Sequence, residues 1–241
     1  MIKQFFKKII FPNTYSNERY IAYLRGNKVI IGENCVFYSP NKTTIDVRKP
    51  YLIKIGDNCK ITQYVSILAH DYSIDVPRQV FGLFVGGSLP VTIGNNVFIG
   101  TKATILMGTT IGNNCIIGAN SVVKGFFPDN SIIAGNPARI IGTIEDYYKK
   151  NIDNWIKNAK TVAKTIFDRA GRLPTIEEMS DGYCWLYLQK DDNTIKLYKS
   201  FFDLTGDNYD DILQKFYEFE PPYDSFESFL KDCNLEKDSR S

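Results

Sequence analysis

The sequence predicts a mainly β protein, a parallel β-helix followed by an α-helical extension, and three observations support this prediction. Six aliphatic residues stand six apart in the middle of the 241-residue chain: Ile93, Ile99, Ile105, Ile111, Ile117 and Val123. Gly, Asn and Asp recur at fixed positions between them. The pattern changes to a helical one after Gly142. A period of six fits neither an α-helix nor a lone strand, but it is typical of a coil whose sides are each one short strand and one turn.

Residues 1–28 are expected to form a segment that caps the open end of the coil. The stretch from Met1 to Phe11 is short, basic and amphipathic, and weak contact with a membrane surface is the alternative for it. No cleavage site of small residues follows, so a signal peptide is not expected. The chain has no run of eighteen apolar residues, and its formal charge of +2 argues against nucleic acid as a partner.

Residues 29–142 are predicted to form the coil itself. The six-residue pattern starts imperfectly at 29–36, is interrupted at 38–42, resumes over 53–68 and closes at 131–141. β-Branched residues fill the strand positions. Asn and Asp fill the corners, where a left-handed backbone is needed that these two residues tolerate.

Three of the five cysteines, Cys35, Cys59 and Cys115, end near-identical pentapeptides and share one phase of the repeat. Elsewhere the same phase holds small or apolar residues: Val65, Val97, Ala103, Thr109 and Ser121. These three cysteines are therefore expected to be buried thiols. No closely spaced pair suggests a zinc or redox site, and a reducing, cytoplasmic environment is expected.

An inserted loop is predicted at residues 70–90, because the spacing of Ile67 and Ile93 is not a multiple of six. Long loops within a compact repeat are usually functional. This loop carries aromatic and mixed polar residues, which suit a carbohydrate site. The candidates for contact with an acceptor are Asp71, Tyr72 and Arg78. The alternative is a loop that packs only against a neighbouring subunit.

Residues 143–241 are predicted to be a mostly helical extension. Apolar residues over 152–166 fall on one helical stripe, which Gly171 and Pro174 would end. Further helices are expected at 209–219 and 225–233. This part contains no chemical motif, and packing against the coil or a neighbouring subunit is the expected role of its many aromatic residues.

Three motifs carry a resemblance to a known family. They read Pro-Val-Thr-Ile-Gly-Asn-Asn-Val-Phe-Ile-Gly at 90–100, Ile-Gly-Ala-Asn-Ser-Val-Val at 117–123 and Ala-Gly-Asn-Pro-Ala-Arg at 134–139. On these motifs the stretch 53–141 resembles the hexapeptide-repeat acyltransferases, and within them the sugar and surface-polysaccharide O-acetyltransferases related to maltose acetyltransferase. The resemblance implies a left-handed parallel β-helix, an exception to the usual right-handed crossover rule.

His70 is the only histidine in the chain, and it stands where the repeat stops and the loop begins. The catalytic histidine of the resembling family occupies such a place. Imidazole can take up a proton near neutral pH, as a general base must. The resemblance implies that His70 deprotonates an acceptor, which attacks the thioester of acetyl-CoA directly, without an acyl-enzyme. A backbone N–H such as that of Gly100 would hold the oxyanion, and Asp71 is a candidate to orient the imidazole.

The resemblance also implies contacts for the acetyl-CoA donor. The residues that match the family's donor site are Gly100, Thr101, Gly118, Ala119, Lys124 and Arg139. The glycine and small residues would contact the pantetheine arm through their backbone, and Arg139 would bind phosphate. Lys124 stands where the family usually has threonine, because Lys-Gly replaces the family's Thr-Lys-Asp after Val123.

The function expected from the resemblance is acetyl-CoA-dependent O-acetylation of a sugar hydroxyl, in the biosynthesis of a surface polysaccharide or glycan. The alternative is N-acetylation of an amino sugar or a small xenobiotic, and a non-enzymatic scaffold is less favoured. A zinc-dependent carbonic anhydrase on such a coil needs several histidines, and this chain has one. No metal is expected. The resemblance further implies a homotrimer with donor sites between adjacent coils.

Overall fold

A computed structural model describes residues 10–180, 182–197 and 209–235 of the chain. These residues fall into two compact units, which divide between Tyr147 and Tyr148. Within the described residues, no helix combines the length and the apolar character that crossing a membrane requires.

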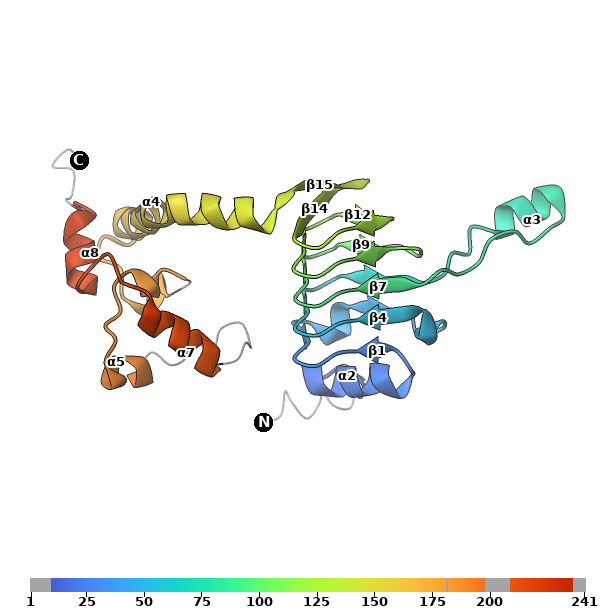
Figure 1. Cartoon of the computed structure of the whole chain (residues 1–241), viewed down its shortest axis with the longest axis horizontal. Helices are drawn as coiled ribbons and strands as arrows, with labels where there is room; N and C mark the ends of the chain where they lie inside the picture. The colour runs from blue at the N-terminus through green and yellow to red at the C-terminus, as the bar shows by residue number, and fades with distance from the viewer. Residues whose placement is uncertain (1–9, 181, 198–208, 236–241) are drawn as a thin grey trace. The chain divides into compact units, whose positions relative to one another are not determined.

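The first unit is a stack of short parallel strands arranged in three sheets (Figure 1). The first sheet contains β1 (Ile30–Ile31), β4 (Ile53–Ile55), β7 (Val91–Ile93), β10 (Thr110–Ile111) and β13 (Phe126–Phe127). The second contains β2 (Val36–Phe37), β5 (Lys60–Ile61), β8 (Phe98–Ile99), β11 (Ile116–Ile117), β14 (Ser131–Gly135) and β15 (Ala138–Thr143). The third contains β3 (Thr44–Ile45), β6 (Ser66–Ile67), β9 (Thr104–Ile105) and β12 (Val122–Val123). Because successive strands visit the three sheets in turn, the chain winds as a three-sided coil.

The six-residue spacing is confirmed as the register of this coil. Ile93 pairs with Ile111 in the first sheet, Ile99 with Ile117 in the second, and Ile105 with Val123 in the third. All six side chains are at most 1% exposed. The aliphatic residues of each sheet therefore stack directly above one another and form the core of the unit.

Asn residues hold the corner between the first and second sheets, as predicted. Asn34, Asn58, Asn96, Asn114 and Asn130 all have φ between 54° and 62°. The residue just before the corner asparagine also stabilises the corner, and this was not predicted. From the second coil upward, its side-chain oxygen accepts a hydrogen bond from a backbone N–H one coil below, at 2.8 Å in each case.

Two insertions interrupt the coil between the third sheet and the first. The shorter is residues 46–52, and the longer is residues 68–90, which we call the arm. The arm contains helix α3 (Asp75–Phe81), which ends at Gly82 with φ +84°, and Figure 1 shows it projecting from the stack. The first coil also has a third side, β3, that the sequence analysis missed. A 3₁₀ turn (Pro40–Lys42) lengthens that side and breaks the period of six.

Different elements cover the two ends of the stack. Helix α2 (Asn17–Gly26) begins at Ser16, whose hydroxyl accepts from the Arg19 N–H, and it buries Tyr20 and Leu24 beside the first coil. At the other end β15 folds back antiparallel to β14. Residues 1–9, on which the expected membrane contact depends, lie outside the described residues.

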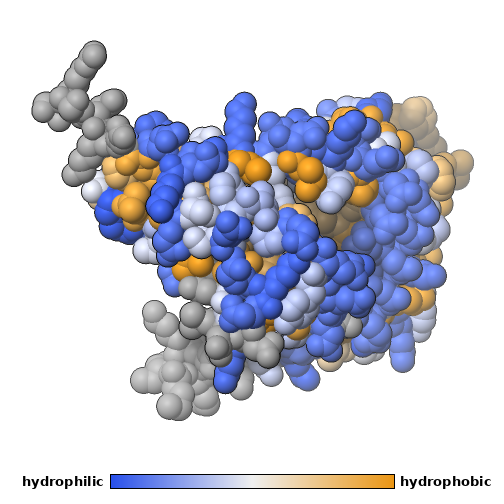
Figure 2. Space-filling view, turned by 60° about the vertical axis from the view of Figure 1, so that its left-hand side comes forward, coloured by the Kyte–Doolittle hydropathy of each residue, from blue (hydrophilic) through white to orange (hydrophobic). Residues whose placement is uncertain are grey.

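The second unit is helical, as predicted. It includes most of α4 (Ile144–Ala170), together with α5 (Asp192–Leu197), α7 (Tyr209–Glu218) and α8 (Phe226–Asp232). Helix α4 ends at Gly171, with φ +68°, and Ser225 caps α8. The core of this unit is made of aliphatic, sulfur-containing and aromatic residues, among them Ala159, Ala163, Met179, Tyr187, Phe216 and Phe229. The face turned forward in Figure 2 is mostly hydrophilic, with hydrophobic residues in small patches.

Candidate active site

The predicted site residues lie mainly at two different corners of the coil. We call residues 46–52, 68–90, 106–109 and 124–125, which connect the third sheet to the first, the histidine corner. Residues 100–103 and 118–121 connect the second sheet to the third and form the glycine corner. His70, Asp71, Tyr72, Arg78 and Lys124 belong to the histidine corner. Gly100, Thr101, Gly118 and Ala119 belong to the glycine corner.

His70 faces a buried carboxylate that the sequence analysis missed. Its Nδ1 atom contacts Oδ2 of Asp46, which follows β3 one coil below. Asp46 is 4% exposed, and its carboxylate also accepts from the Arg48 N–H at 3.0 Å and the Ala69 N–H at 3.2 Å. Three donors therefore fix the Asp46 carboxylate, and the carboxylate fixes the imidazole.

The Asp46 contact also determines which ring nitrogen can act as a base. An ionised carboxylate only accepts hydrogen bonds, so the Nδ1 atom of a neutral His70 must carry the proton. The lone pair then lies on Nε2. The side chain of His70 is 18% exposed, which leaves the ring accessible to a reactant. In its neutral form His70 would thus have one fixed tautomer with a free lone pair, which is what proton abstraction from a hydroxyl requires.

Backbone hydrogen bonds between the first and last residues of the arm hold His70 in place. The Leu89 N–H donates to the Ala69 carbonyl and the Asp71 N–H to the Gly87 carbonyl, each at 3.1 Å. His70 itself forms an isolated antiparallel bridge with Ser88. The histidine is consequently held by backbone pairing, although it lies at the start of a long insertion.

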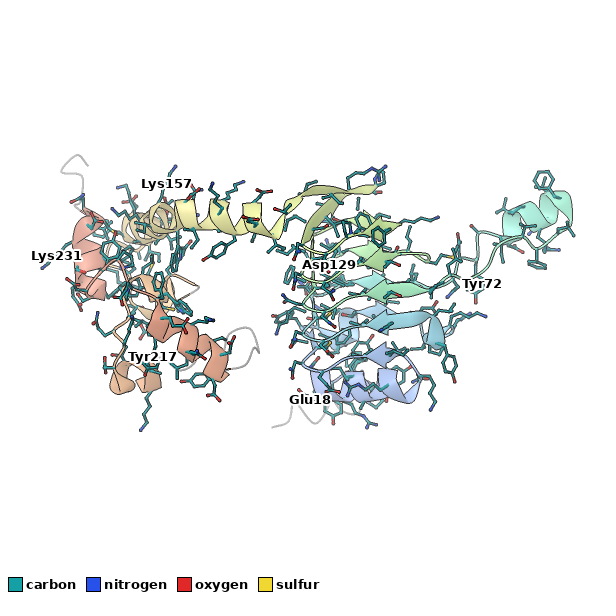
Figure 3. The ribbon with its side chains drawn as sticks, in the orientation of Figure 1. Glu18, Tyr72, Asp129, Lys157, Tyr217 and Lys231 are labelled. Carbon is teal, nitrogen blue, oxygen red and sulfur yellow. The ribbon has the colours of Figure 1, made fainter. Side chains whose placement is uncertain are left out.

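Tyr72 lies on the arm (Figure 3), and its ring packs against that of His70. The two ring centroids are 4.5 Å apart, with the planes at 65°. The Arg48 guanidinium donates to the Tyr72 hydroxyl at 3.0 Å and stands 5.8 Å from the centre of its ring. Tyr72 is 61% exposed, so this side of the histidine corner offers an accessible aromatic face and a cation.

Asp71 does not contact the imidazole. Its carboxylate accepts from the Ser73 N–H at 2.8 Å and the Ser73 hydroxyl at 2.9 Å. The backbone hydrogen bond from Ser73 is the main cause that lowers the pKa of Asp71, and the charge of Lys124 lowers it further. Lys124 directly follows β12 at the same corner. The orienting position that the sequence suggested for Asp71 is occupied by Asp46.

Arg78 lies on α3, in the outer part of the arm. Its guanidinium pairs with Asp75 at 3.4 Å and stands 5.2 Å from the centre of the Phe84 ring. These contacts are local to the arm, so the structure does not bring Arg78 to His70 within one copy of the chain.

At the glycine corner the structure contradicts one prediction. The Gly100 N–H donates to the Ile117 carbonyl at 2.8 Å, so it cannot also hold an oxyanion. Within the described residues, the next N–H along the chain, that of Thr101, has no acceptor. Gly100 is needed here for space, because a Cβ at this position would lie 2.6 Å from the Ala119 nitrogen.

Arg139 lies on β15, opposite Ala134 of β14, which places it beyond the glycine corner. A Cβ at Gly118 would lie 3.0 Å from the Ala134 side chain, so these residues adjoin. The Arg139 side chain is exposed and donates to the carbonyl of Ala138 at 2.8 Å. Its charge therefore remains available to an anion at this end of the corner.

One copy of the chain does not bring the two corners together. The third sheet separates them: its strand β9 is Thr104–Ile105, and the middle of one corner lies about six residues from the middle of the next, or at most about 20 Å of extended chain. The histidine corner holds the pair of His70 and Asp46, and the glycine corner holds closely packed small residues with the Arg139 cation beyond them. Within the described residues, no group of three His, Cys, Asp or Glu side chains could bind a metal ion.

Comparison with known proteins identifies relatives of this chain. Residues 90–124 match the model of a family described as the hexapeptide repeat of succinyl-transferase. Protein CapG of Staphylococcus aureus is 39% identical over 153 residues, which cover 64% of this chain and 85% of CapG. The galactoside O-acetyltransferase of Escherichia coli strain K12 is 38% identical over 137 residues, 55% of this chain. The matched segment spans 63% of that enzyme, less than two thirds of its length.

Among solved structures, a hexapeptide-repeat acetyltransferase from Vibrio cholerae O1 biovar eltor, complexed with acetyl coenzyme A, also resembles the chain. The two are 25% identical with a TM-score of 0.38, over 52% of this chain and 76% of the other.

Proposed function

The chain belongs to the hexapeptide-repeat acetyltransferases, and from this premise we propose that it transfers the acetyl group of acetyl-CoA to a sugar hydroxyl. The acceptor would be a precursor or segment of a surface polysaccharide or another glycan. The observation that carries the proposal is the contact between the chain's sole histidine and the buried Asp46 carboxylate. The name of the E. coli relative supports a sugar hydroxyl as the acceptor.

In the proposed mechanism His70 acts as the general base. Its Nε2 atom takes the proton from the acceptor hydroxyl while the oxygen attacks the thioester carbonyl. The tetrahedral oxyanion then collapses, the C–S bond breaks, and the CoA sulfur leaves with the proton from the imidazolium. Asp46 stabilises the imidazolium that forms between the two steps. No covalent acyl-enzyme forms.

We assign the oxyanion contact to the Thr101 N–H instead of the Gly100 N–H, since only the former lacks an acceptor within the described residues. Gly118 and Ala119 would contact the pantetheine chain of CoA through their backbone. Arg139 would bind a phosphate of CoA, because a guanidinium matches phosphate oxygens in charge and geometry. Lys124 follows β12 at the histidine corner, so its contact would be with the donor close to the reacting carbonyl.

The separation of the two corners supports a site shared between copies of the chain. In a homotrimer of left-handed coils, the histidine corner of one copy would face the glycine corner of the next, which gives three equivalent sites. The arm supports the same arrangement, because isolated soluble chains rarely expose large apolar patches. Six of its large apolar residues are each at least 67% exposed: Val76, Val80, Phe81, Leu83, Phe84 and Val85.

The acceptor would bind on the side of the histidine corner that holds Tyr72, Arg48 and Asp71. The exposed ring of Tyr72 offers a face for the C–H groups of a sugar, and the carboxylate of Asp71 can accept from its hydroxyls. We also propose a cytoplasmic location, which suits the five free thiols of the chain.

The test is release of free CoA thiol from acetyl-CoA with free, nucleotide-linked and lipid-linked sugars as acceptors. We expect turnover with a sugar hydroxyl, and a loss of about 10²- to 10⁴-fold in kcat for His70→Ala, because only the base is removed. The affinity for acetyl-CoA, measured by calorimetry, should change by less than about twofold. Full activity of His70→Ala, or turnover with amines alone, would refute the proposed mechanism or acceptor.

A further inference from the structure

The helical unit contains a hollow that no part of the proposed mechanism uses. Its volume is about 280 Å³. It is lined by Tyr148, Asn151, Ile152, Trp155, Trp185 and Phe219. We call this hollow the aromatic pocket. Four of its six lining residues are aromatic, and they include both tryptophans of the chain.

The rings of the aromatic pocket are held in a fixed arrangement. The Trp155 indole N–H donates to the Gly182 carbonyl at 2.9 Å, which sets the orientation of this ring. The Phe219 ring lies 5.6 Å from Trp155 and 6.0 Å from Trp185, tilted by 51° and 47°. Trp185 also packs edge-on against Phe216, 5.3 Å away. The rings thus form the walls of a concave surface that is present before any ligand binds.

The chemistry of the lining favours an uncharged ligand. No lining residue carries a formal charge at neutral pH. A nucleotide or another phosphate would therefore find no cation in the pocket, although indole and phenol rings could stack on its base. The Asn151 amide and the Tyr148 hydroxyl add polar groups to an otherwise apolar wall. A sugar ring matches this arrangement, since one of its faces is made of C–H groups and its edge carries hydroxyls.

The size of the pocket argues against a folded protein as the occupant. A stable protein interface buries about 800 Å² on each partner. A hollow of about 280 Å³ with six lining residues is too small for that, but it has room for one or two sugar rings.

We propose that the aromatic pocket is a carbohydrate-binding subsite that holds uncharged sugar units of the acceptor glycan other than the unit that is acetylated. This inference rests on the proposed function for the identity of the ligand. The binding itself does not require acetyl transfer, so the two ideas can fail separately.

The test is a titration of the full-length protein with uncharged oligosaccharides of four to six units, followed by tryptophan fluorescence. Because both tryptophans line the pocket, we expect a saturable change in their emission. Tyr148→Ala removes an exposed lining ring and should weaken binding by about five- to tenfold. Tyr147→Ala is the matched control: Tyr147 adjoins Tyr148 on α4 and is 51% exposed, but it does not line the pocket.

His70→Ala should bind these oligosaccharides as tightly as the wild type, which separates this test from that of acetyl transfer. Binding that is equally weakened by Tyr147→Ala and Tyr148→Ala would overturn the proposal. So would the absence of a saturable response to any uncharged oligosaccharide, or a response confined to acidic oligosaccharides or to a proline-rich peptide.

Discussion

At the scale of single residues, the decisive contact joins His70 to a carboxylate 24 positions earlier in the chain. The coil makes this contact possible because Ile45 and Ile67 pair in adjacent strands, which stacks the following residues. Asp46 is buried and bound by two backbone N–H groups, so it is an anchored acceptor. Its influence on catalysis would be exerted through His70, which makes Asp46 a positioning residue.

Asp46→Asn should change the tautomer of His70. An asparagine amide can donate to Nδ1 and move the ring proton to Nε2, which removes the lone pair from the reacting nitrogen. We expect kcat to fall by roughly two orders of magnitude or more, as for other Asp→Asn changes behind a catalytic histidine. The tautomer can be read from the ¹⁵N chemical shifts of the imidazole, since the chain has only one histidine.

Asp71→Asn serves as the matched control for this experiment. It replaces the carboxylate of the residue that follows His70 in the sequence. That carboxylate accepts hydrogen bonds from Ser73 and does not contact the His70 ring. The ¹⁵N pattern of His70 should remain that of the wild type in this variant. A pattern that is unchanged in Asp46→Asn, or equally changed in both variants, would show that Asp46 does not set the tautomer.

The sequence drew attention to His70 but not to its partner. The sole histidine stands where the repeat breaks, and the family resemblance made that position a candidate for the base. Asp46 follows the third side of the first coil, where the 3₁₀ turn at 40–42 obscures the period of six. Its placement below His70 requires the register of β3 with β6, which spacing did not give.

At the scale of elements, the corner between the first and second sheets is stabilised by a ladder of side chains. Asp57, Asn95, Asn113 and Asp129 each accept a backbone N–H from the coil below. The repeat of Asn and Asp in the sequence therefore has two physical causes: a left-handed backbone at one position and this hydrogen bond at the position before it.

Asp129, at the last step of this ladder, should make stability depend on pH. The hydrogen bond from the Asn113 backbone lowers the pKa of Asp129 in the folded protein, and the Asn113 side chain lowers it further. A carboxyl with a lowered folded pKa contributes stability above its unfolded pKa and loses that contribution as pH falls through its folded pKa. Asp129→Asn keeps an accepting oxygen but cannot titrate.

The measurement is the melting temperature of both proteins between neutral and strongly acidic pH. We expect the wild type to be the more stable at neutral pH, and the difference from Asp129→Asn to shrink as the pH approaches the folded pKa. A difference that stays constant across this range would mean that the Asp129 charge does not act through the ladder.

The elements themselves were predictable to different degrees. The strands from Ile93 to Val123 followed from spacing, because an uninterrupted coil repeats its register every turn. The long helix α4 followed from its apolar stripe and from Gly171. Helix α3 was not foreseen, since none of its residues is buried and it leaves no apolar stripe against a core.

At the scale of the whole molecule, the proposed active site depends on two corners that one coil keeps apart. His70 and Asp46 lie at one corner, and Thr101 and Ala119 lie at the other. The proposed trimer would join them across an interface, so each site would need residues from two copies. A single chain would then lack the activity, however well it folds.

Complementation between two inactive variants tests this claim most directly. His70→Ala removes the base, and Ala119→Trp places a bulky ring at an exposed position of the glycine corner, where it should block the donor. Each variant alone should be inactive. Mixed trimers, purified through a different tag on each variant, should regain about one third of the wild-type activity, because each has one intact composite site. Mixed trimers as inactive as the two parents would contradict the shared site.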